Sequence, residues 1–203
     1  MDLYPELADL SLDELVARLR SGGNYDDYYE AVVERIAASG RPGIDCLYAE
    51  LDRKQLPQAL AVIDGLFQVS GTDPIFGARM RELLREHESD LLAEAIVALG
   101  YLGAADVQGE VLGFLDHESP TVRSAVLQYV RRNSGESAKP ILIRALSDRH
   151  ALVRESAVDE LGDLGAVDAI TDLTPLVEDS NEAVRQAART AVASLTELAA
   201  AGR

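Results

Sequence analysis

Apolar residues recur along this chain at helical spacing, with polar residues between them. Val153, Ala157, Leu161 and Leu164 advance by three or four positions, which places them on one face of a helix. No segment shows the alternating β-branched pattern that is typical of strands. The pattern therefore predicts an all-α chain of about six stacked antiparallel helix pairs. The expected ranges are Ser11–Arg20 with Tyr25–Ala38, Ile44–Leu51 with Leu56–Val69, Pro74–Glu86 with Ser89–Leu102, Ala104–Leu115 with Pro120–Arg132, Ala138–Leu146 with Ala151–Leu164, and Val167–Val177 with Glu182–Ala200.

Polar residues and glycines mark where several of these helices begin and end. Ser11 and Glu14 have the spacing of a capping box. Asp73 and Ser119 each precede a proline, so we expect each to cap a helix with that proline in its first turn. Glycines that can adopt the left-handed conformation are expected at the other end. They are Gly100, Gly103, Gly162 and Gly165.

A valine–arginine pair recurs every 31 residues in the second half of the chain, each time after an aspartate. The three sets are Asp116 with Val122 and Arg123, Asp148 with Val153 and Arg154, and Asp179 with Val184 and Arg185. The segment around Leu92 carries the same apolar positions 30 residues before the first set. A fixed period of this length is the signature of a stacked-repeat protein.

These motifs resemble HEAT repeats, in which an aspartate of the turn is followed by Val-Arg near the start of the second helix. The unit is shorter than the roughly 40–47 residues usual for that family, and it looks like the short bacterial variety known from phycobilisome lyases. The resemblance extends from Asp73 to the C-terminus. It implies an α-solenoid with an Asp–Arg ladder between neighbouring repeats and with its second helices on the concave face.

Composition fits one domain over residues 1–203, because a chain of this length can bury a core by stacking helices. The single cysteine, Cys46, excludes an intrachain disulfide and is expected to be a small core residue. No charged-then-apolar leader opens the chain, and no apolar run approaches the roughly 18 residues of a membrane span. We therefore expect a cytoplasmic protein with no membrane partner.

The chain is strongly acidic, with 35 Asp and Glu against 19 Lys and Arg and a formal net charge of −16. Such a surface serves solubility, and it also attracts a basic partner while it repels nucleic acid. Both interpretations stay open. The excess of acids is larger in residues 1–100 than in residues 101–203.

Tyrosines and carboxylates gather near residue 25, and this pairing suits recognition of Lys or Arg side chains. We expect Tyr28 or Tyr29 to pack into the core and the rest of the segment to form part of a contact patch. If the second helices line the concave face, further acidic residues join it in a broken stripe. The candidate partner-binding residues are Tyr25, Asp26, Asp27, Glu30, Glu34, Asp64, Glu94, Tyr101, Glu155 and Asp159.

Catalytic motifs are missing, because the chain has neither a phosphate-binding glycine loop nor a nucleophile elbow. His87 and His117 each precede a glutamate and resemble the His-Glu dyads of an iron hydroxylase built from HEAT repeats. They fall in turns of adjacent repeats, about 10 Å apart, which is too far for one metal ion. His150 lies in a third such turn. We therefore expect no metal, no cofactor and no enzymatic activity.

The sequence predicts a non-catalytic protein-interaction module, a monomer when free. Its size and charge favour an acidic binder or inhibitor, of the immunity type, for a basic bacterial protein such as a toxin domain. Two alternatives remain. One is a general scaffold or regulatory HEAT-repeat protein, and the other is a subunit of a bilin-lyase-type enzyme, which the repeat resemblance allows.

Overall fold

The structure of the chain is a computed structural model that describes residues 3–21, 26–53, 55, 58–70 and 73–201. These residues form helices and no strand, in six consecutive pairs. The α-helices are α1 Leu12–Ser21, α2 Asp26–Ala38, α3 Arg41–Leu51, α4 Gln58–Ser70, α5 Pro74–Leu83, α6 Ser89–Tyr101, α7 Gln108–Leu112, α8 Pro120–Ser134, α9 Lys139–Ala145, α10 Ala151–Asp163, α11 Ile170–Leu173 and α12 Glu182–Ala201. Short 3-10 turns join them: η1 Pro5–Leu7, η2 Ala105–Val107, η3 Gly135–Ala138, η4 Val167–Ala169 and η5 Thr174–Glu178.

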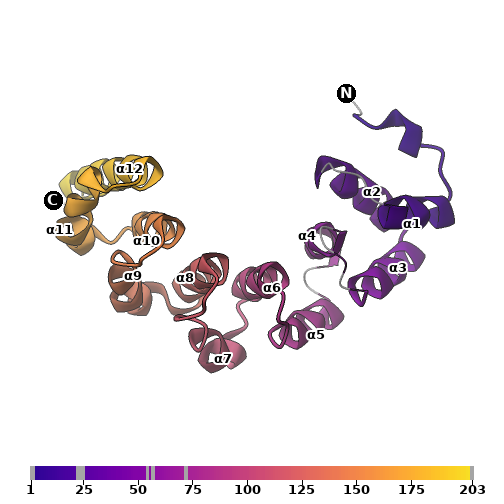
Figure 1. The fold of residues 1–203 in the computed structure, drawn as a ribbon, viewed down its shortest axis with the longest axis horizontal. Coiled ribbons are helices and arrows are strands. Elements are labelled where there is room, and N and C mark those ends of the chain that lie inside the picture. Colours follow the sequence, from indigo (N-terminus) through magenta and orange to yellow (C-terminus); the bar gives the residue numbers. More distant parts are fainter. Residues whose placement is uncertain (1–2, 22–25, 54, 56–57, 71–72, 202–203) are drawn as a thin grey trace. The chain divides into compact units, whose positions relative to one another are not determined.

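The chain divides into two compact units, Met1–Met80 and Arg81–Arg203, and the division falls within α5. In the first unit, α2 packs against α1, α3 and α4. In the second unit, α6, α8, α10 and α12 form a row in which each helix packs on the next. Figure 1 shows this row on one side of the second unit and α7, α9 and α11 on the other. The predicted all-α solenoid of antiparallel helix pairs is confirmed.

Small apolar residues allow the helices of the second unit to pack closely. Ala125, Ala157 and Ala188 are all buried, as is Leu161 on the same face of α10 as Ala157. Removal of such side chains from water is the main favourable contribution to folding. Helical periodicity alone therefore located the core of this unit.

Two of the four glycines expected at helix ends serve a different purpose. Gly103 and Gly165 follow α6 and α10 with φ of 65° and 69°, the left-handed conformation that was predicted. Gly100 and Gly162 instead lie inside those helices, so the prediction for them is wrong. A Cβ on Gly100 would lie 3.2 Å from the Cα of Tyr129, which shows that this glycine lets α8 approach α6.

Most predicted helix starts agree with the structure. The backbone N–H of Ser11 donates to Glu14 at 2.8 Å and that of Glu14 donates back to Ser11 at 3.4 Å, which completes a capping box. Asp73 accepts from the N–H of Ile75 at 2.9 Å. Ser119 precedes α8, but its side chain makes no capping hydrogen bond, so that prediction is wrong.

The first helices of the later repeats are more broken than their apolar pattern indicates. The predicted helix Val167–Val177 is divided into η4, α11 and η5. Pro175 lies in the first turn of η5, where its missing N–H and its ring oppose a continuous α-helix. The predicted helix Ala104–Leu115 is likewise reduced to η2 and α7.

Three further expectations concern two helix starts, the cysteine and membrane-spanning helices. The expected starts at Tyr25 and Leu56 lie outside the described residues. Cys46 is a free thiol that is only half-buried, so it is not the core residue that was expected. Among the helices of the described residues, none combines the length and the apolar character that crossing a membrane requires.

Candidate functional site

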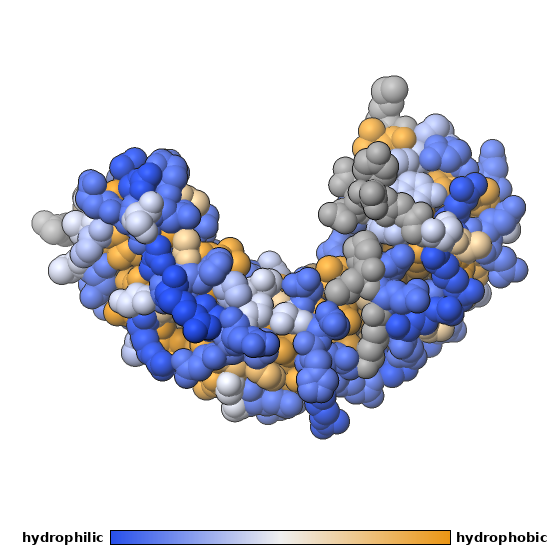
Figure 2. Space-filling model, viewed as in Figure 1, coloured by the Kyte–Doolittle hydropathy of each residue, from blue (hydrophilic) through white to orange (hydrophobic). Residues whose placement is uncertain are grey.

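Exposed polar residues follow one face of the helix row in the second unit. On α6, Asp90 and Tyr101 are exposed and Glu94 is half-buried. On α10, Glu155 is half-buried and Asp159 is exposed. Positions three, four and seven residues apart share a helix face, so each helix presents one stripe. Figure 2 shows hydrophilic residues over much of the visible surface of both units, with apolar residues between them.

The acidic stripe is interrupted on α8, where Arg131 and Arg132 lie between the residues of α6 and α10. The guanidinium of Arg132 lies 4.0 Å from the centre of the Tyr101 ring and donates to its hydroxyl at 2.7 Å. This is a cation–π contact within the chain. Tyr101 therefore faces a cation of its own chain, while part of its ring remains exposed.

Arg131 is held by carboxylates of α10. It forms an ion pair with Glu160 and lies 3.5 Å from Asp163. Glu160 is buried, whereas Asp163 is exposed. Arg131 and Arg132 of α8 are thus both engaged by groups of the protein itself, whereas Asp90 and Asp159 form no ion pair among the described residues.

Asp159 is the most perturbed acid of the face. Desolvation by the surrounding protein raises its pKa to about 6, and the carboxylates of Glu155, Glu160 and Asp163 add to the effect. The side chain is nevertheless exposed to solvent, so the crowding of negative charge is the firmer of the two causes. A cation brought to this position would relieve the repulsion.

In the first unit, three of the predicted residues meet at a groove. Glu30 and Glu34 of α2 and Asp64 of α4 line a hollow of about 500 Å³ between the two helices. All three carboxylates are exposed. Leu3 and Tyr4, at the start of the described chain, form another part of the lining. We call this hollow the α2–α4 groove.

The tyrosine cluster near residue 25 differs in membership from the predicted one. Tyr29 is buried in the core, as was expected of one tyrosine. Tyr28 packs edge-on against Tyr4, with ring centres 5.3 Å apart. Tyr25 lies outside the described residues, as do the side chains of Asp26 and Asp27. The contribution of Tyr4 was missed, because no periodic pattern connects it with α2.

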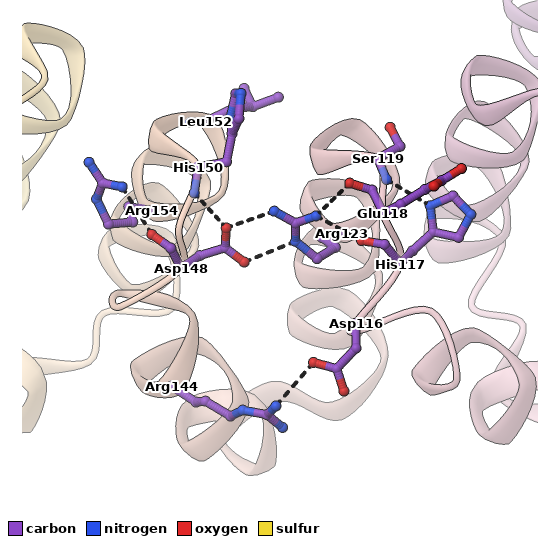
Figure 3. A network of polar contacts seen from close by, with 10 residues as sticks. All are labelled: Asp116, His117, Glu118, Ser119, Arg123, Arg144, Asp148, His150, Leu152 and Arg154. Atoms are coloured by element: carbon purple, nitrogen blue, oxygen red, sulfur yellow. Dashed lines mark hydrogen bonds and ion pairs between the residues drawn. The ribbon is translucent and has the colours of Figure 1, made fainter.

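Arginine–aspartate pairs link successive repeats of the second unit. Arg123 on α8 donates to both carboxylate oxygens of Asp148, at 2.9 and 2.7 Å (Figure 3). Arg154 on α10 does the same to Asp179, at 2.8 and 2.7 Å. Such two-pronged pairs are the strongest geometry for this interaction. These two links are the predicted Asp–Arg ladder.

The ladder begins one residue away from its predicted position. Six residues before Arg123 stands His117, at the place that Asp148 and Asp179 occupy before the next two arginines. The Nη1 of Arg123 donates to the carbonyl of His117 at 2.7 Å, and His117 Nδ1 accepts from the N–H of Ser119 at 3.1 Å (Figure 3). The turn is therefore the same, with imidazole in place of carboxylate.

Asp116 has a different partner from the one predicted. Its carboxylate accepts from Arg144 of α9 at 3.1 Å, in an exposed pair that also joins two repeats (Figure 3). At the position 30 residues before Arg123, α6 carries the buried Ala93. Because α6 has no arginine at this position, an aspartate in the turn before α8 would have no ladder partner on α6. At the other end, Arg185 donates to the carbonyl of Asp179 and pairs with Glu182 within its own repeat.

The ladder shifts the titration of its carboxylates. Burial raises the pKa of Asp148, but hydrogen bonds from Arg123 and from the N–H of His150 outweigh this and hold the pKa below its ordinary value. The hydrogen bonds from Arg154 lower the pKa of Asp179. Both carboxylates are therefore stabilised as anions.

Two of the three histidines, His117 and His150, accept backbone hydrogen bonds in their turns. His150 Nδ1 accepts from the N–H of Leu152 at 3.3 Å, and His117 Nδ1 likewise accepts from the residue two positions ahead, although His150 is the residue before α10 and so corresponds to Ser119. Within the part of the chain that the structure describes, no three His, Cys, Asp or Glu side chains are grouped so that they hold a metal ion.

Comparison with solved structures supports the architecture. The complex of CpcE and CpcF of phycocyanin lyase from Nostoc sp. PCC7120 contains a chain with a TM-score of 0.58 and 22% sequence identity. The match covers 76% of this chain and 65% of that one, so this chain spans less than two thirds of its neighbour's length. An engineered protein gives a TM-score of 0.55 at 15% identity, with 92% of this chain and 96% of that chain covered. At these identities the likeness concerns the fold alone.

Comparison of sequences identifies the family of the repeats and the residues that they cover. No curated protein matches the chain. The family of HEAT repeats matches residues 78–155 and 130–195, a region that holds the ladder and all three valine–arginine pairs. Because these matches cover more than half of the chain, it belongs to the HEAT-repeat family.

Proposed function

We propose that this chain is a non-catalytic protein-interaction module that binds a basic protein through the acidic faces of its second helices. HEAT repeats present an extended, rigid surface of stacked helices, which favours protein partners. The proposal rests on which charged side chains of the helix row in the second unit form ion pairs within the chain and which do not. Arg131 and Arg132 are engaged internally, whereas Asp90 and Asp159 form no ion pair among the described residues.

The most concrete form of this function is an inhibitor of the immunity type for a basic bacterial protein. An exposed field of one sign speeds encounter with a partner of the opposite sign. The net charge of −16 supports this form, and so does the position of Asp159, whose pKa is raised by desolvation and by the neighbouring carboxylates of Glu155, Glu160 and Asp163. A general scaffold has the same fold and surface but does not block the activity of its partner.

Affinity capture from the native host, followed by elution with a salt gradient, tests the proposal. We expect one basic protein to elute at high salt, because exposed charges attract over only about 8 Å at physiological ionic strength. Its association rate should fall as salt rises, with little change in dissociation. An acidic partner, or an association rate indifferent to salt, would overturn the proposal. Loss of the partner's activity in the complex separates the inhibitor from the scaffold.

The likeness to the phycocyanin lyase complex favours a second candidate, a subunit of a bilin-lyase-type enzyme. This candidate requires the chain to bind a tetrapyrrole, alone or with a second subunit. Titration with a tetrapyrrole should then change the visible absorbance spectrum of the chromophore. An unchanged spectrum in the presence of the captured partner would leave the interaction module as the function.

A further inference from the structure

The α2–α4 groove of the first unit has the dimensions of a ligand pocket and is large enough to admit a long side chain. Its volume of about 500 Å³ lies within the range of roughly 300–1,000 Å³ that is typical of small-ligand pockets. The groove runs between two neighbouring helices of the same compact unit. All the residues that line it therefore belong to the first unit.

Small residues form the apolar part of the groove. Ala31 of α2 and Ala61 and Gly65 of α4 all line it. A Cβ on Gly65 would lie 2.2 Å from a methyl carbon of Val33, so the two helices approach as closely as a glycine permits. We call these small residues the apolar strip of the groove.

Carboxylates line this groove as well. Glu30 and Glu34 lie four residues apart on α2, where like charges repel and weaken a helix. Among the described residues, neither they nor Asp64 form an ion pair. Gln68 donates to Asp64 at 2.8 Å and holds that carboxylate in place. Binding of a cation would offset the repulsion between Glu30 and Glu34.

The one arginine of the groove is already used to build its wall. Arg35 donates to the carbonyl of Ala31 at 3.2 Å and to that of Tyr4 at 3.4 Å. The ring of Tyr4 also packs against Tyr28. These contacts hold the segment of Leu3 and Tyr4 beside α2, where it closes one side of the groove.

Exposed apolar side chains stand among the charged groups of the lining. Leu3 is 76% exposed and Val69 is 52% exposed, and both line the groove. A lining that combines apolar surface with carboxylates matches a side chain with an aliphatic stem and a cationic head. Lysine and arginine are the two residues of that kind.

We propose that the α2–α4 groove receives one lysine or arginine side chain from an extended segment of a protein partner. The inference rests on the proposed function and deepens it by naming the anchor and its receptor. The stem of the side chain lies along Ala31, Ala61 and Gly65, and its cation meets Glu30, Glu34 and Asp64. Because the three acids line one hollow, we expect them to act together on a single cation.

A peptide-binding measurement on the full chain tests the groove. The probe is a fluorescent ten-residue peptide in which arginine alternates with alanine, and its matched control carries glutamine for every arginine. Affinity is followed by fluorescence anisotropy, and the site is mapped by NMR chemical shifts of backbone amides. We expect the arginine peptide to bind, the glutamine peptide not to bind, and the largest shifts to occur in α2 and α4.

Three variants distinguish binding in the groove from general attraction by the net charge. Glu30→Gln with Glu34→Gln should weaken the arginine peptide by roughly tenfold, since two charge-assisted contacts are lost. Glu178→Gln with Glu197→Gln removes the same charge from exposed positions of the second unit and should change the affinity less than about twofold. Ala61→Leu keeps every charge but fills the groove, and it should weaken binding as well.

The outcomes distinguish the inference from the function on which it rests. Equal weakening by the two glutamate pairs, or full binding by Ala61→Leu, overturns the groove as receptor. Peptide shifts confined to the second unit do the same. If a basic host protein is nevertheless captured with strong salt dependence, the proposed function stands without the groove. If neither the peptide nor a basic host protein binds, both fail.

Discussion

At the residue scale, glycines decide how closely helices of the first unit approach. A Cβ at Gly43 would lie 1.8 Å from the carbonyl oxygen of Ile36, a contact with backbone that no rotamer change relieves. Gly43→Ala should therefore lower the free energy of unfolding by at least about 1–3 kcal/mol, the usual cost of overpacking. Thermal unfolding followed by circular dichroism measures the change.

Gly109 provides the matched control for that substitution. It also lies in a helix, α7, but a Cβ there would meet no atom within 4 Å. Gly109→Ala should stabilise the protein by up to about 0.5–1 kcal/mol, because alanine loses less conformational entropy in a helix. Similar melting temperatures for the two variants would contradict the packing of α3 on the end of α2.

Asp159 gives a second residue-scale prediction, on pH dependence. Its folded pKa of about 6 lies above the unfolded value of about 3.9, so ionisation disfavours the fold. The penalty is fully present above pH 6 and is relieved as the pH falls through 6. Asp159→Asn should raise the melting temperature at pH 7.5, and the gain should shrink at pH 5. Because the side chain is exposed, we expect an effect on the order of a few tenths of a kcal/mol.

Comparison with Glu178→Gln tests whether that gain is specific to Asp159. Glu178 is exposed in η5 and forms no ion pair among the described residues, so its neutralisation removes the same charge without relieving the cluster. A gain for Asp159→Asn that matches this control at both pH values would assign the effect to net charge.

At the element scale, the ladder ties each second helix to the turn of the next repeat. A double-mutant cycle with Arg123→Ala and Asp148→Ala should give a coupling energy of about 0.5–3 kcal/mol, since Arg123 is buried and Asp148 nearly so. The pair of Lys139 and Asp168 also joins two repeats, but the aspartate is exposed, so its cycle should show no resolvable coupling. Strict additivity for Arg123 and Asp148 would mean that the two side chains lie close together but contribute no coupling energy to stability.

The same carboxylates predict how stability changes in acid. The folded pKa values of Asp148 and Asp179 lie below their unfolded values, so their contribution is present above about pH 4. It is lost as the pH falls through the depressed folded values. Urea unfolding at pH 7, 4 and 3 should show a steeper loss below pH 4 for the parent than for Asp148→Asn. If the parent and Asp148→Asn lose stability in parallel, these pairs are not the cause of the acid sensitivity.

The second helices and the ladder were predictable because both depend on short, regular spacing. Two first helices, those containing α7 and α11, were predicted too long, because 3-10 turns interrupt the apolar pattern there, at Pro175 in the second case. The assignment of Asp116 failed because of one extra residue: it stands seven positions before Arg123, whereas Asp148 and Asp179 stand six before Arg154 and Arg185. Counting back from the arginine identifies His117 instead.

At the scale of the whole molecule, the binding surface was only partly visible in the sequence. Glu30, Glu34 and Asp64 were predicted as acids on second helices, and the structure brings them to one groove. The wall formed by Leu3 and Tyr4 was not predicted, because it depends on tertiary contacts of Arg35 and Tyr28. Internal pairing of Arg131 and Arg132 was equally hidden, since net charge counts residues without regard to their partners. The expectation of a single domain over residues 1–203 stays a prediction.

The ladder pairs should also affect local unfolding of the second unit. In a repeat protein each repeat contacts only its neighbours, so stability is close to a sum over repeat interfaces. Arg154→Ala removes the pair that links α10 with the turn before α12. Local opening of the last repeat should then become easier, and amide hydrogen exchange of α12 should quicken by about tenfold if roughly 1.4 kcal/mol is lost.

Arg185→Ala is the matched control, and it isolates the link between repeats. Arg154 and Arg185 each donate to the carbonyl six residues earlier, Asp148 at 2.9 Å and Asp179 respectively. Only Arg154 reaches an aspartate of the following repeat among the described residues. Both variants lose the contact within the turn, so exchange in α12 should quicken more for Arg154→Ala than for Arg185→Ala, and α2 should be unaffected by either. Equal acceleration would assign the effect to the turn, and the ladder would then contribute nothing to the cohesion of the second unit.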